Sequence, residues 1–99
     1  MFAVIWEYEV HAGREGEFAA LYGGEGAWVA LFREYAGYIN TELLRDATQP
    51  QRFVTIDRWT SQTVYDAFLV AAKPGYADID ALGDALTVDE RCVGRFEAA

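Results

Sequence analysis

The residues best suited to chemistry lie between positions 57 and 65, where an expected strand passes into an expected helix. Asp57 and Trp59 are two residues apart, so they share one face of the strand, and Tyr65 follows near the start of the helix. A carboxylate that is partly buried among apolar groups has a raised pKa and can accept a phenolic proton. We therefore predict a small-molecule site at this corner, with Asp57 as the base and with Trp59 and Tyr65 orienting the ligand.

Asp57 has a simpler alternative, because several arginines lie in or beside the same hairpin. An ion pair would keep the carboxylate charged and purely structural, and this is the commoner arrangement for such a residue. The candidate partners are Arg45, Arg52 and Arg58. Both interpretations stay open at the level of the sequence.

Aromatic residues form the largest constellation in the chain. Such rings can wall a pocket for a flat organic ligand, or they can simply fill a core, as aromatic residues at helical spacing usually do. So much aromatic bulk packs imperfectly without voids, which favours a pocket. The set comprises Trp6, Tyr8, Trp28, Phe32, Trp59, Tyr65, Phe68 and Tyr76. Of these, the residues expected to contact the ligand are Trp6, Tyr8, Phe32, Phe68 and Tyr76.

Motifs for cofactors and metals are absent from the sequence. The glycines at 23, 24 and 26 lack the spacing of a dinucleotide fingerprint and follow no strand. One histidine and one cysteine cannot make a zinc site, so neither a metal nor a cofactor is expected. His11 is expected on the surface, and Cys92 is expected to be a small buried apolar residue. A set of helical acids is expected to form a solvated face: Asp78, Asp80 and Asp84.

The composition limits the partners of the protein. Sixteen acids against eight bases give a net charge of -8, which repels phosphate backbones and anionic lipids, so neither nucleic acid nor a membrane is expected as a partner. No apolar run is long enough to span a bilayer, and residues 1–10 do not resemble a signal peptide. A single cysteine cannot form an intrachain disulfide, so the sequence does not indicate an oxidising compartment. We expect a cytoplasmic protein whose 99 residues form one domain.

The periodicity of apolar residues predicts the elements that position the site. Strands are expected at 2–11, 38–46, 52–59 and about 91–97. Two helical segments, at about 14–22 and 27–35, are separated by glycines, and a further helix capped by Thr60 or Ser61 is expected to end at Pro74-Gly75. A shorter helical piece should cover 76–86, and Thr87 to Glu90 match a capping box, which predicts one more helical turn.

This order predicts an α+β fold of the ferredoxin-like βαββαβ type, a four-stranded antiparallel sheet with helices on one face. On the third strand, Val54 and Ile56 lie opposite Asp57 and Trp59, so both faces of the sheet are apolar. On the last strand we expect one face to carry Cys92, Gly94 and Phe96. A second copy of the sheet is the simplest cover for the face without helices, and the sequence therefore predicts a homodimer.

Several segments resemble the antibiotic biosynthesis monooxygenase-type domain, a family of dimeric α+β barrels. The resemblance lies in residues 2–10, 37–46, 52–68 and 86–97. It implies a homodimer with a ligand cavity between sheet and helices in each subunit. In members that oxidise polyketide quinols, no metal or flavin is needed, because the deprotonated substrate gives an electron to oxygen. Those members carry a tryptophan at the end of the third strand and a tyrosine six residues later, which Trp59 and Tyr65 match.

The chain departs from two branches of that family. The asparagine that quinol-oxidising members have four residues before the tryptophan falls on Thr55, and the axial histidine of the haem-degrading branch falls near Asp78. The first hypothesis is a cofactor-independent monooxygenase-like enzyme for a small aromatic or quinol-type substrate. The alternative is a non-catalytic dimer that binds a hydrophobic metabolite in a stress or accessory role. A purely structural dimer, and isomerase or lyase chemistry, also stay open.

Overall fold

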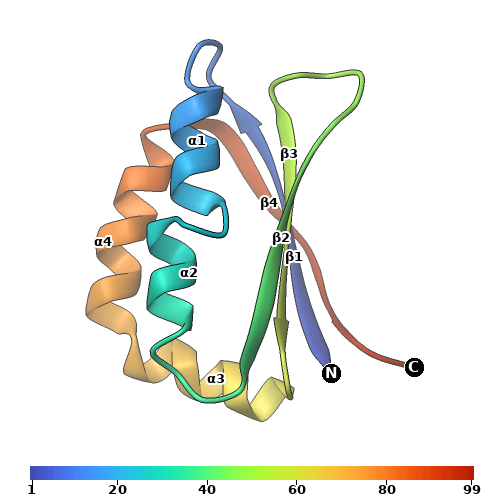
Figure 1. The fold of residues 1–99 in the computed structure, drawn as a ribbon, viewed down its shortest axis with the longest axis vertical. Coiled ribbons are helices and arrows are strands. Elements are labelled where there is room, and N and C mark those ends of the chain that lie inside the picture. The colour runs from blue at the N-terminus through green and yellow to red at the C-terminus, as the bar shows by residue number, and fades with distance from the viewer.

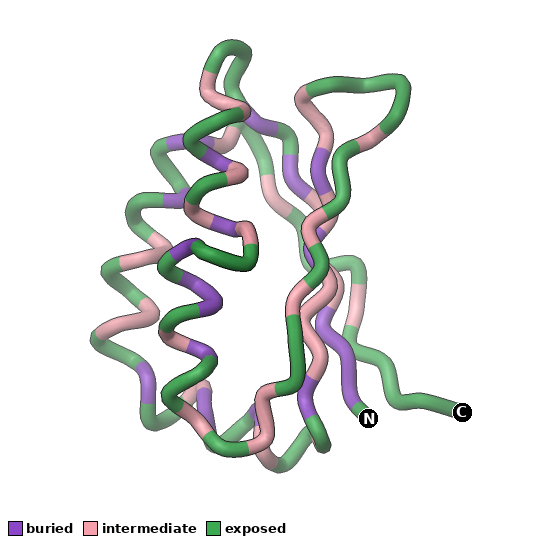
Figure 2. The backbone as a smooth tube through the Cα atoms, viewed as in Figure 1, coloured by how far each residue is buried: buried purple, intermediate pink, exposed green.

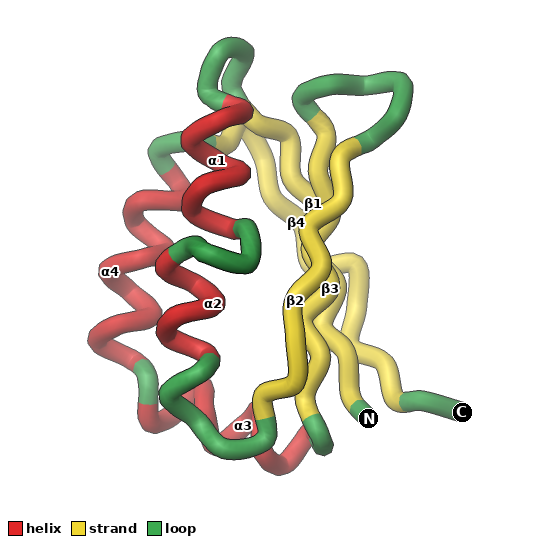
Figure 3. The backbone as a smooth tube through the Cα atoms, viewed as in Figure 1, coloured by secondary structure: helices red, strands yellow, loops and turns green.

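The computed structural model describes all 99 residues and contains four strands and four helices (Figure 1). In chain order these are β1 (Phe2–Val10), α1 (Glu15–Tyr22), α2 (Ala27–Phe32), β2 (Tyr38–Arg45), β3 (Arg52–Trp59), α3 (Gln62–Ala71), α4 (Lys73–Asp84) and β4 (Thr87–Glu97). The strands form one antiparallel sheet in the order β2-β3-β1-β4. All helices lie on one side of the sheet, and the other side carries none (Figure 3). This confirms the predicted ferredoxin-like fold.

The core lies between the sheet and the helices, as the distribution of buried residues shows (Figure 2). Successive side chains of a strand point to opposite faces, so every second residue of β1 and β3 faces the helices. On β1 these include Phe2, Val4 and Tyr8, and on β3 they include Thr55 and Trp59; all five are buried. The cross-strand pairs Phe2–Trp59 and Trp6–Thr55 therefore bring the aromatic residues of β1 beside the site residues of β3.

Two predicted helix ends are confirmed, the break between α1 and α2 and the start of α3. Gly26 separates α1 from α2, and a side chain at this position would overlap the carbonyl oxygen of Leu21, so only glycine fits the turn. Ser61 caps α3, because its side-chain oxygen accepts a 3.2 Å hydrogen bond from the backbone N–H of Val64. The cap fixes the corner at which β3 ends and α3 begins.

Two predicted helix boundaries are wrong. Pro74 does not stop a helix but lies in the first turn of α4, where its missing N–H leaves no hydrogen bond unmade. Thr87 does not open a helical turn; it begins β4, paired with Val10, and its hydroxyl donates a 3.3 Å hydrogen bond to the carbonyl of Gly83. The capping-box pattern fails because residues 87–90 complete the edge of the sheet. As a result, Glu90 becomes a strand residue that faces the helices.

A register shift in β4 changes which of its side chains face the core. Ile5 pairs with Gly94 while Trp6 pairs with Cys92, so one extra residue bulges from the strand between them. The expected grouping of Cys92 with Gly94 and Phe96 is therefore wrong. Cys92 is also exposed rather than buried, because β4 is an edge strand. The same shift places the Arg95 guanidinium over the ring of Tyr65, 5.3 Å from its centroid.

The face of the sheet without helices mixes apolar residues with ion pairs. Leu44 and Phe96 are exposed on it, and Phe96 keeps 48% of its surface accessible. Partly buried Val54 and Ile56 lie between them on β3. The surrounding ion pairs join Glu7 to Arg52 and Arg91, and Glu42 to Arg58. None of the helices is long and apolar enough to cross a membrane.

Candidate functional site

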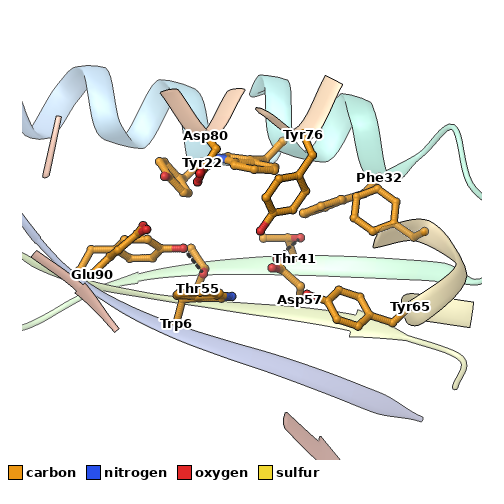
Figure 4. A pocket seen from close by; sticks show the side chains of 13 residues that line it. Trp6, Tyr22, Phe32, Thr41, Thr55, Asp57, Tyr65, Tyr76, Asp80 and Glu90 are labelled. Atoms are coloured by element: carbon orange, nitrogen blue, oxygen red, sulfur yellow. Dashed lines mark hydrogen bonds between the residues drawn. The ribbon is translucent and has the colours of Figure 1, made fainter. Parts of the chain in front are cut away.

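A cavity lies between the sheet and the helices, and it is lined mainly by aromatic side chains (Figure 4). It has about 540 Å³ of space free of protein atoms, including its mouth. We refer to this cavity as the slot. Its lining residues are Trp6, Tyr8, Tyr22, Trp28, Phe32, Thr41, Thr55, Asp57, Tyr65, Phe68, Tyr76, Asp80 and Glu90.

Asp57 lies at one end of the slot, at the end of a hydrogen-bonded chain. The Tyr38 hydroxyl donates to the Thr41 hydroxyl at 2.8 Å, and the Thr41 hydroxyl donates to Asp57 Oδ1 at 2.7 Å. Burial raises the pKa of the Asp57 carboxyl to about 6, and the hydrogen bond from Thr41 only partly offsets this. Asp57 is therefore ionised at neutral pH but basic enough to accept a proton from a bound ligand.

The alternative of an ion pair for Asp57 is wrong. The candidate partners bind other acids: Arg45 lies 3.8 Å from Glu15, Arg52 contacts Glu7 and Asp46, and Arg58 contacts Glu42. Arg58 follows Asp57 in the strand and so points to the opposite face of the sheet. No cation neutralises the Asp57 carboxylate, and its only protein hydrogen bond is the one from Thr41.

Tyrosines surround the Asp57 end of the slot. The side chain of Tyr76 descends from α4 toward Thr41 and Asp57, and Tyr65 approaches from α3 (Figure 4). Burial raises the pKa of both phenols above the ordinary value, and the nearby Asp57 charge raises it further. Both hydroxyls therefore stay protonated and can donate hydrogen bonds to a ligand.

The opposite end of the slot is acidic. Asp80 from α4, Glu90 from β4 and the phenol of Tyr22 lie close together there (Figure 4). The carboxylates of Asp80, Asp84 and Glu90 lie within 4.8 Å of one another, and none of them forms an ion pair. Burial and their mutual repulsion raise the pKa of both Asp80 and Glu90. The predicted solvated face of α4 thus holds for exposed Asp78 and Asp84 but not for Asp80.

Trp59 lies behind the wall of the slot rather than in it, although the sequence pattern predicted that it would orient a ligand. Its side chain is 0% exposed and packs against Phe32 and Tyr65, with ring centroids 5.5 and 5.6 Å away. Its indole N–H has no hydrogen-bond partner. Phe32, Tyr65 and Phe68, which line the slot, pack against the indole. Trp59 thus supports rings of the slot and is not itself one of its lining residues.

The slot brings together seven of the eight residues that the sequence singled out: Asp57, Tyr65, Trp6, Tyr8, Phe32, Phe68 and Tyr76. Sequence reasoning did not assign Tyr22, Thr41 and Glu90 to the site. Thr41 pairs with Asp57 and so faces the helices, and a register shift between Tyr38 and Asn40 keeps the two-residue period from predicting this from the start of β2. Glu90 was missed because of the false capping box. Thr55 lines the slot with its hydroxyl 3.1 Å from the Tyr8 hydroxyl.

The fold and the slot together define an α+β protein of the ferredoxin-like class with a cavity lined mainly by aromatic residues. A family model described as antibiotic biosynthesis monooxygenase matches residues 1–81, and the chain belongs to this family. A search of curated proteins found no match.

Solved structures share the fold. SnoaB from Streptomyces nogalater, a cofactor-independent oxygenase, has 24% sequence identity and a TM-score of 0.82, and the match covers 99% of this chain and 92% of SnoaB. A proposed antibiotic biosynthesis monooxygenase from Deinococcus radiodurans is 18% identical with a TM-score of 0.77, covering 100% and 93% of the two chains. A further one, from Nitrosomonas europaea, is 16% identical with a TM-score of 0.72, covering 99% and 98%. At these identities the likeness establishes the fold.

Proposed function

We propose that this protein is a cofactor-independent, monooxygenase-like enzyme that oxidises a small aromatic or quinol-type substrate in the slot beside Asp57. The observation that carries the proposal is a carboxyl with a pKa of about 6 that faces an aromatic slot without a neutralising cation. A base of this strength can take a phenolic proton at neutral pH when the phenolate is held in place. The relationship to SnoaB, an oxygenase that acts without a cofactor, supports the same reaction class.

The reaction can be balanced with molecular oxygen as the oxidant. Asp57 takes the proton of a quinol hydroxyl, and the quinolate gives one electron to oxygen, which leaves a semiquinone radical and superoxide. These combine at a ring carbon to form a C–O bond, and the Asp57 carboxylic acid returns its proton to give a hydroperoxide. The O–O bond then breaks, the ring proton and hydroxide leave as water, and a carbonyl remains. The quinol loses two hydrogens and gains one oxygen atom.

The other residues of the slot would hold the substrate in a reactive position. The phenols of Tyr65 and Tyr76 would donate hydrogen bonds to its oxygens, while Trp6, Tyr8, Phe32 and Phe68 would sandwich its ring. Trp59 would act as a positioning residue, because it contacts Phe32 and Tyr65 but not the slot. Exclusion of water from this space would protect the radical pair from side reactions.

Oxygen consumption tests the proposal. Alkylhydroquinones and 1,4-dihydroxynaphthalene would be added in an oxygen electrode, with the enzyme-free rate of autoxidation subtracted. We expect uptake that falls at least 100-fold in Asp57→Asn, since general-base catalysis contributes roughly 10²–10⁴-fold. With ¹⁸O₂, one labelled atom should enter the product. Tyr65→Phe removes the phenol that would hold the substrate in the slot. Tyr35→Phe is its control, because Tyr35 lies outside the slot. Uptake no faster than autoxidation with every compound would refute the proposal.

A non-catalytic binding protein is the second candidate, and Thr55 favours it. Quinol-oxidising relatives are expected to carry an asparagine amide at this position, whereas the Thr55 hydroxyl lies within hydrogen-bonding distance of Tyr8. This function predicts that a redox-inert aromatic such as 2-naphthol raises the melting temperature in proportion to the logarithm of its concentration. It also predicts that no quinol is turned over. Turnover of a quinol would exclude it.

We also propose that the helix-free face of the sheet packs against a second copy in a homodimer. Support comes from the exposed Leu44 and Phe96 around Val54 and Ile56. Sedimentation velocity at about 10 μM should show a dimer. Phe96→Glu should shift it toward the monomer, while Val70→Glu, on an exposed site of α3, should not. A monomeric wild-type protein at this concentration would contradict the proposal.

A further inference from the structure

The charge balance of the slot is one-sided. Three carboxylates line it, Asp57 at one end and Asp80 and Glu90 at the other, and the lining contains no lysine, arginine or histidine. Arg95 stacks on Tyr65 in the aromatic wall and lies 4.0 Å from Asp66, and it forms no ion pair with the acids of the far end. A ligand with a carboxylate or phosphate would meet only repulsion in the slot, and the net charge of -8 would repel it before entry.

The acidic end also differs from an ordinary solvated cluster of acids. Asp80 and Glu90 are partly buried, and they form neither hydrogen bonds nor ion pairs with the rest of the protein. Aromatic rings stand beside them: Tyr22 packs against Trp28 with centroids 6.1 Å apart, and Trp28 packs edge-on against Tyr76 at 4.8 Å. Carboxylates next to ring faces are the surroundings that stabilise an organic ammonium group by charge and by cation–π contact.

The aromatic wall at the acidic end is built from two rings that interact with each other. Trp28 is only 7% exposed and lines the slot, and its buried indole lies beside the phenol of Tyr22. These rings stand next to Asp80 and Glu90, which also line the slot. The acids at this wall favour a positive group on the ligand.

We propose that the slot selects an aromatic amine: a flat oxidisable ring toward Asp57, and a protonated amino group on a short side chain between Asp80 and Glu90. This inference rests on the proposed function for the orientation of the ring. A neutral phenol at the acidic end would donate only one hydrogen bond and would leave the repulsion between the acids in place. An ammonium group donates up to three hydrogen bonds, and its positive charge offsets that repulsion.

Three hydroquinones that differ only in the side chain test the proposal. They are 2-(2,5-dihydroxyphenyl)ethylamine, 2-ethylhydroquinone and 2,5-dihydroxyphenylacetate, which are cationic, neutral and anionic at pH 7. Binding to the full-length protein would be measured under argon by titration calorimetry, so that no turnover is needed. We expect the amine to bind about tenfold more tightly than the ethyl compound, and the acetate to bind more weakly than both. The preference should shrink as salt is added.

Variants assign the preference to the acidic end. In the double variant Asp80→Asn with Glu90→Gln, the amine and the ethyl compound should bind within about twofold of each other. Asp78→Asn is the charge-matched control, since Asp78 is exposed on the same helix and does not line the slot, and it should keep the full preference. If the double variant fails to fold, the preference for the amine is measured in Glu90→Gln alone, where it should fall, and in the salt titration of the wild-type protein.

The outcomes separate this inference from the proposed function. Equal binding of the amine and the ethyl compound, or a preference that survives in the double variant, would overturn the inference. Magnesium or calcium chloride that binds at the acidic end and displaces the amine at equal ionic strength would overturn it in favour of a metal site. In air, oxygen uptake with 2-ethylhydroquinone at the same KM as the amine would uphold the proposed function and refute the selection of an amine. Preferential binding of the amine without oxygen uptake would uphold the selection of an amine and refute the proposed function.

Discussion

The hydroxyl of Thr41 donates a 2.7 Å hydrogen bond to Oδ1 of Asp57, across the pairing of β2 with β3. This bond stabilises the charged carboxylate, whereas burial destabilises it. The pKa of about 6 is the balance of the two effects. Thr41 therefore tunes the basicity of Asp57, which lines the slot without a cation beside it.

Removal of that hydrogen bond should raise the pKa of Asp57 above 6. In Thr41→Val the shape is kept but the donor is lost, so desolvation acts unopposed, and a shift of about one unit corresponds to roughly 1.4 kcal/mol. NMR titration of the ¹³C-labelled side-chain carboxyl measures the change directly. Thr41→Ser keeps the donor and is the control. An unchanged titration midpoint in Thr41→Val would show that the hydrogen bond does not tune the carboxyl.

Catalysis by Asp57 should follow the ionisation of this carboxyl. The base must be deprotonated to accept a proton, so kcat/KM should rise with pH through about 6 and level off above it. Oxygen uptake measured between pH 4.5 and 8 gives the profile once autoxidation is subtracted. Asp57→Asn should lose both the activity and the rising limb. A profile that is flat across this range would exclude Asp57 as the base.

The sequence predicted the residues of the site better than the residues that cover them. Strand alternation grouped Asp57 with Trp59 on one face of β3, and Trp6 with Tyr8 on one face of β1, because the two-residue period needs no knowledge of the partner strand. The structure shows that these faces meet the helices. The raised pKa of Asp57 followed from its apolar neighbours in the strand. Alternation cannot say what covers a residue, however, and this is why Trp59 was expected at the ligand although other rings enclose it.

The errors at the end of the chain have a common cause. The pattern from Thr87 to Glu90 satisfies a local rule for helix starts, but pairing with β1 supplies hydrogen bonds along nine residues of that strand and prevails. The register shift opposite Ile5 and Trp6 then moves Arg95 to the helix side. Both features depend on contacts between segments about 90 residues apart. A single sequence does not encode them in any short pattern.

The stability of the folded protein should increase when Asp57 is replaced by asparagine. The folded state raises the pKa of this carboxyl from 3.8 to about 6, so between these values the protein takes up a proton on folding and its stability falls as the pH rises. Above pH 6 the folded protein holds an unfavourable buried charge, at about 1–3 kcal/mol. Asp57→Asn should regain this at pH 8 and show no gain at pH 4. Urea denaturation at the two pH values makes the comparison.

Tyr65 and Trp59 should differ in what their replacement by phenylalanine does. Tyr65 lines the slot and its hydroxyl has no protein partner, so Tyr65→Phe should change the free energy of unfolding by less than about 0.5 kcal/mol while it weakens ligand binding. Trp59→Phe leaves a void in the core and should destabilise the protein by about 1–3 kcal/mol. Denaturation and calorimetric ligand titration of both variants separate the two roles. Equal destabilisation would show that Tyr65 is also structural.

The acidic end of the slot depends on a glycine in α4. A methyl group at Gly83 would overlap the hydroxyl of Tyr22, so Gly83→Ala must displace the ring that stands beside Asp80 and Glu90. We expect a loss of about 1–3 kcal/mol in the free energy of unfolding, because the ring is held by the core on its other sides. Gly16→Ala in α1 is the control: no atom lies within 4 Å of the added carbon, and the helix propensity of alanine should stabilise the protein by about 0.5 kcal/mol. Denaturation curves measure both changes. If Gly83→Ala were as stable as Gly16→Ala, Tyr22 would be free to move, and the acidic end would not be a rigid part of the slot.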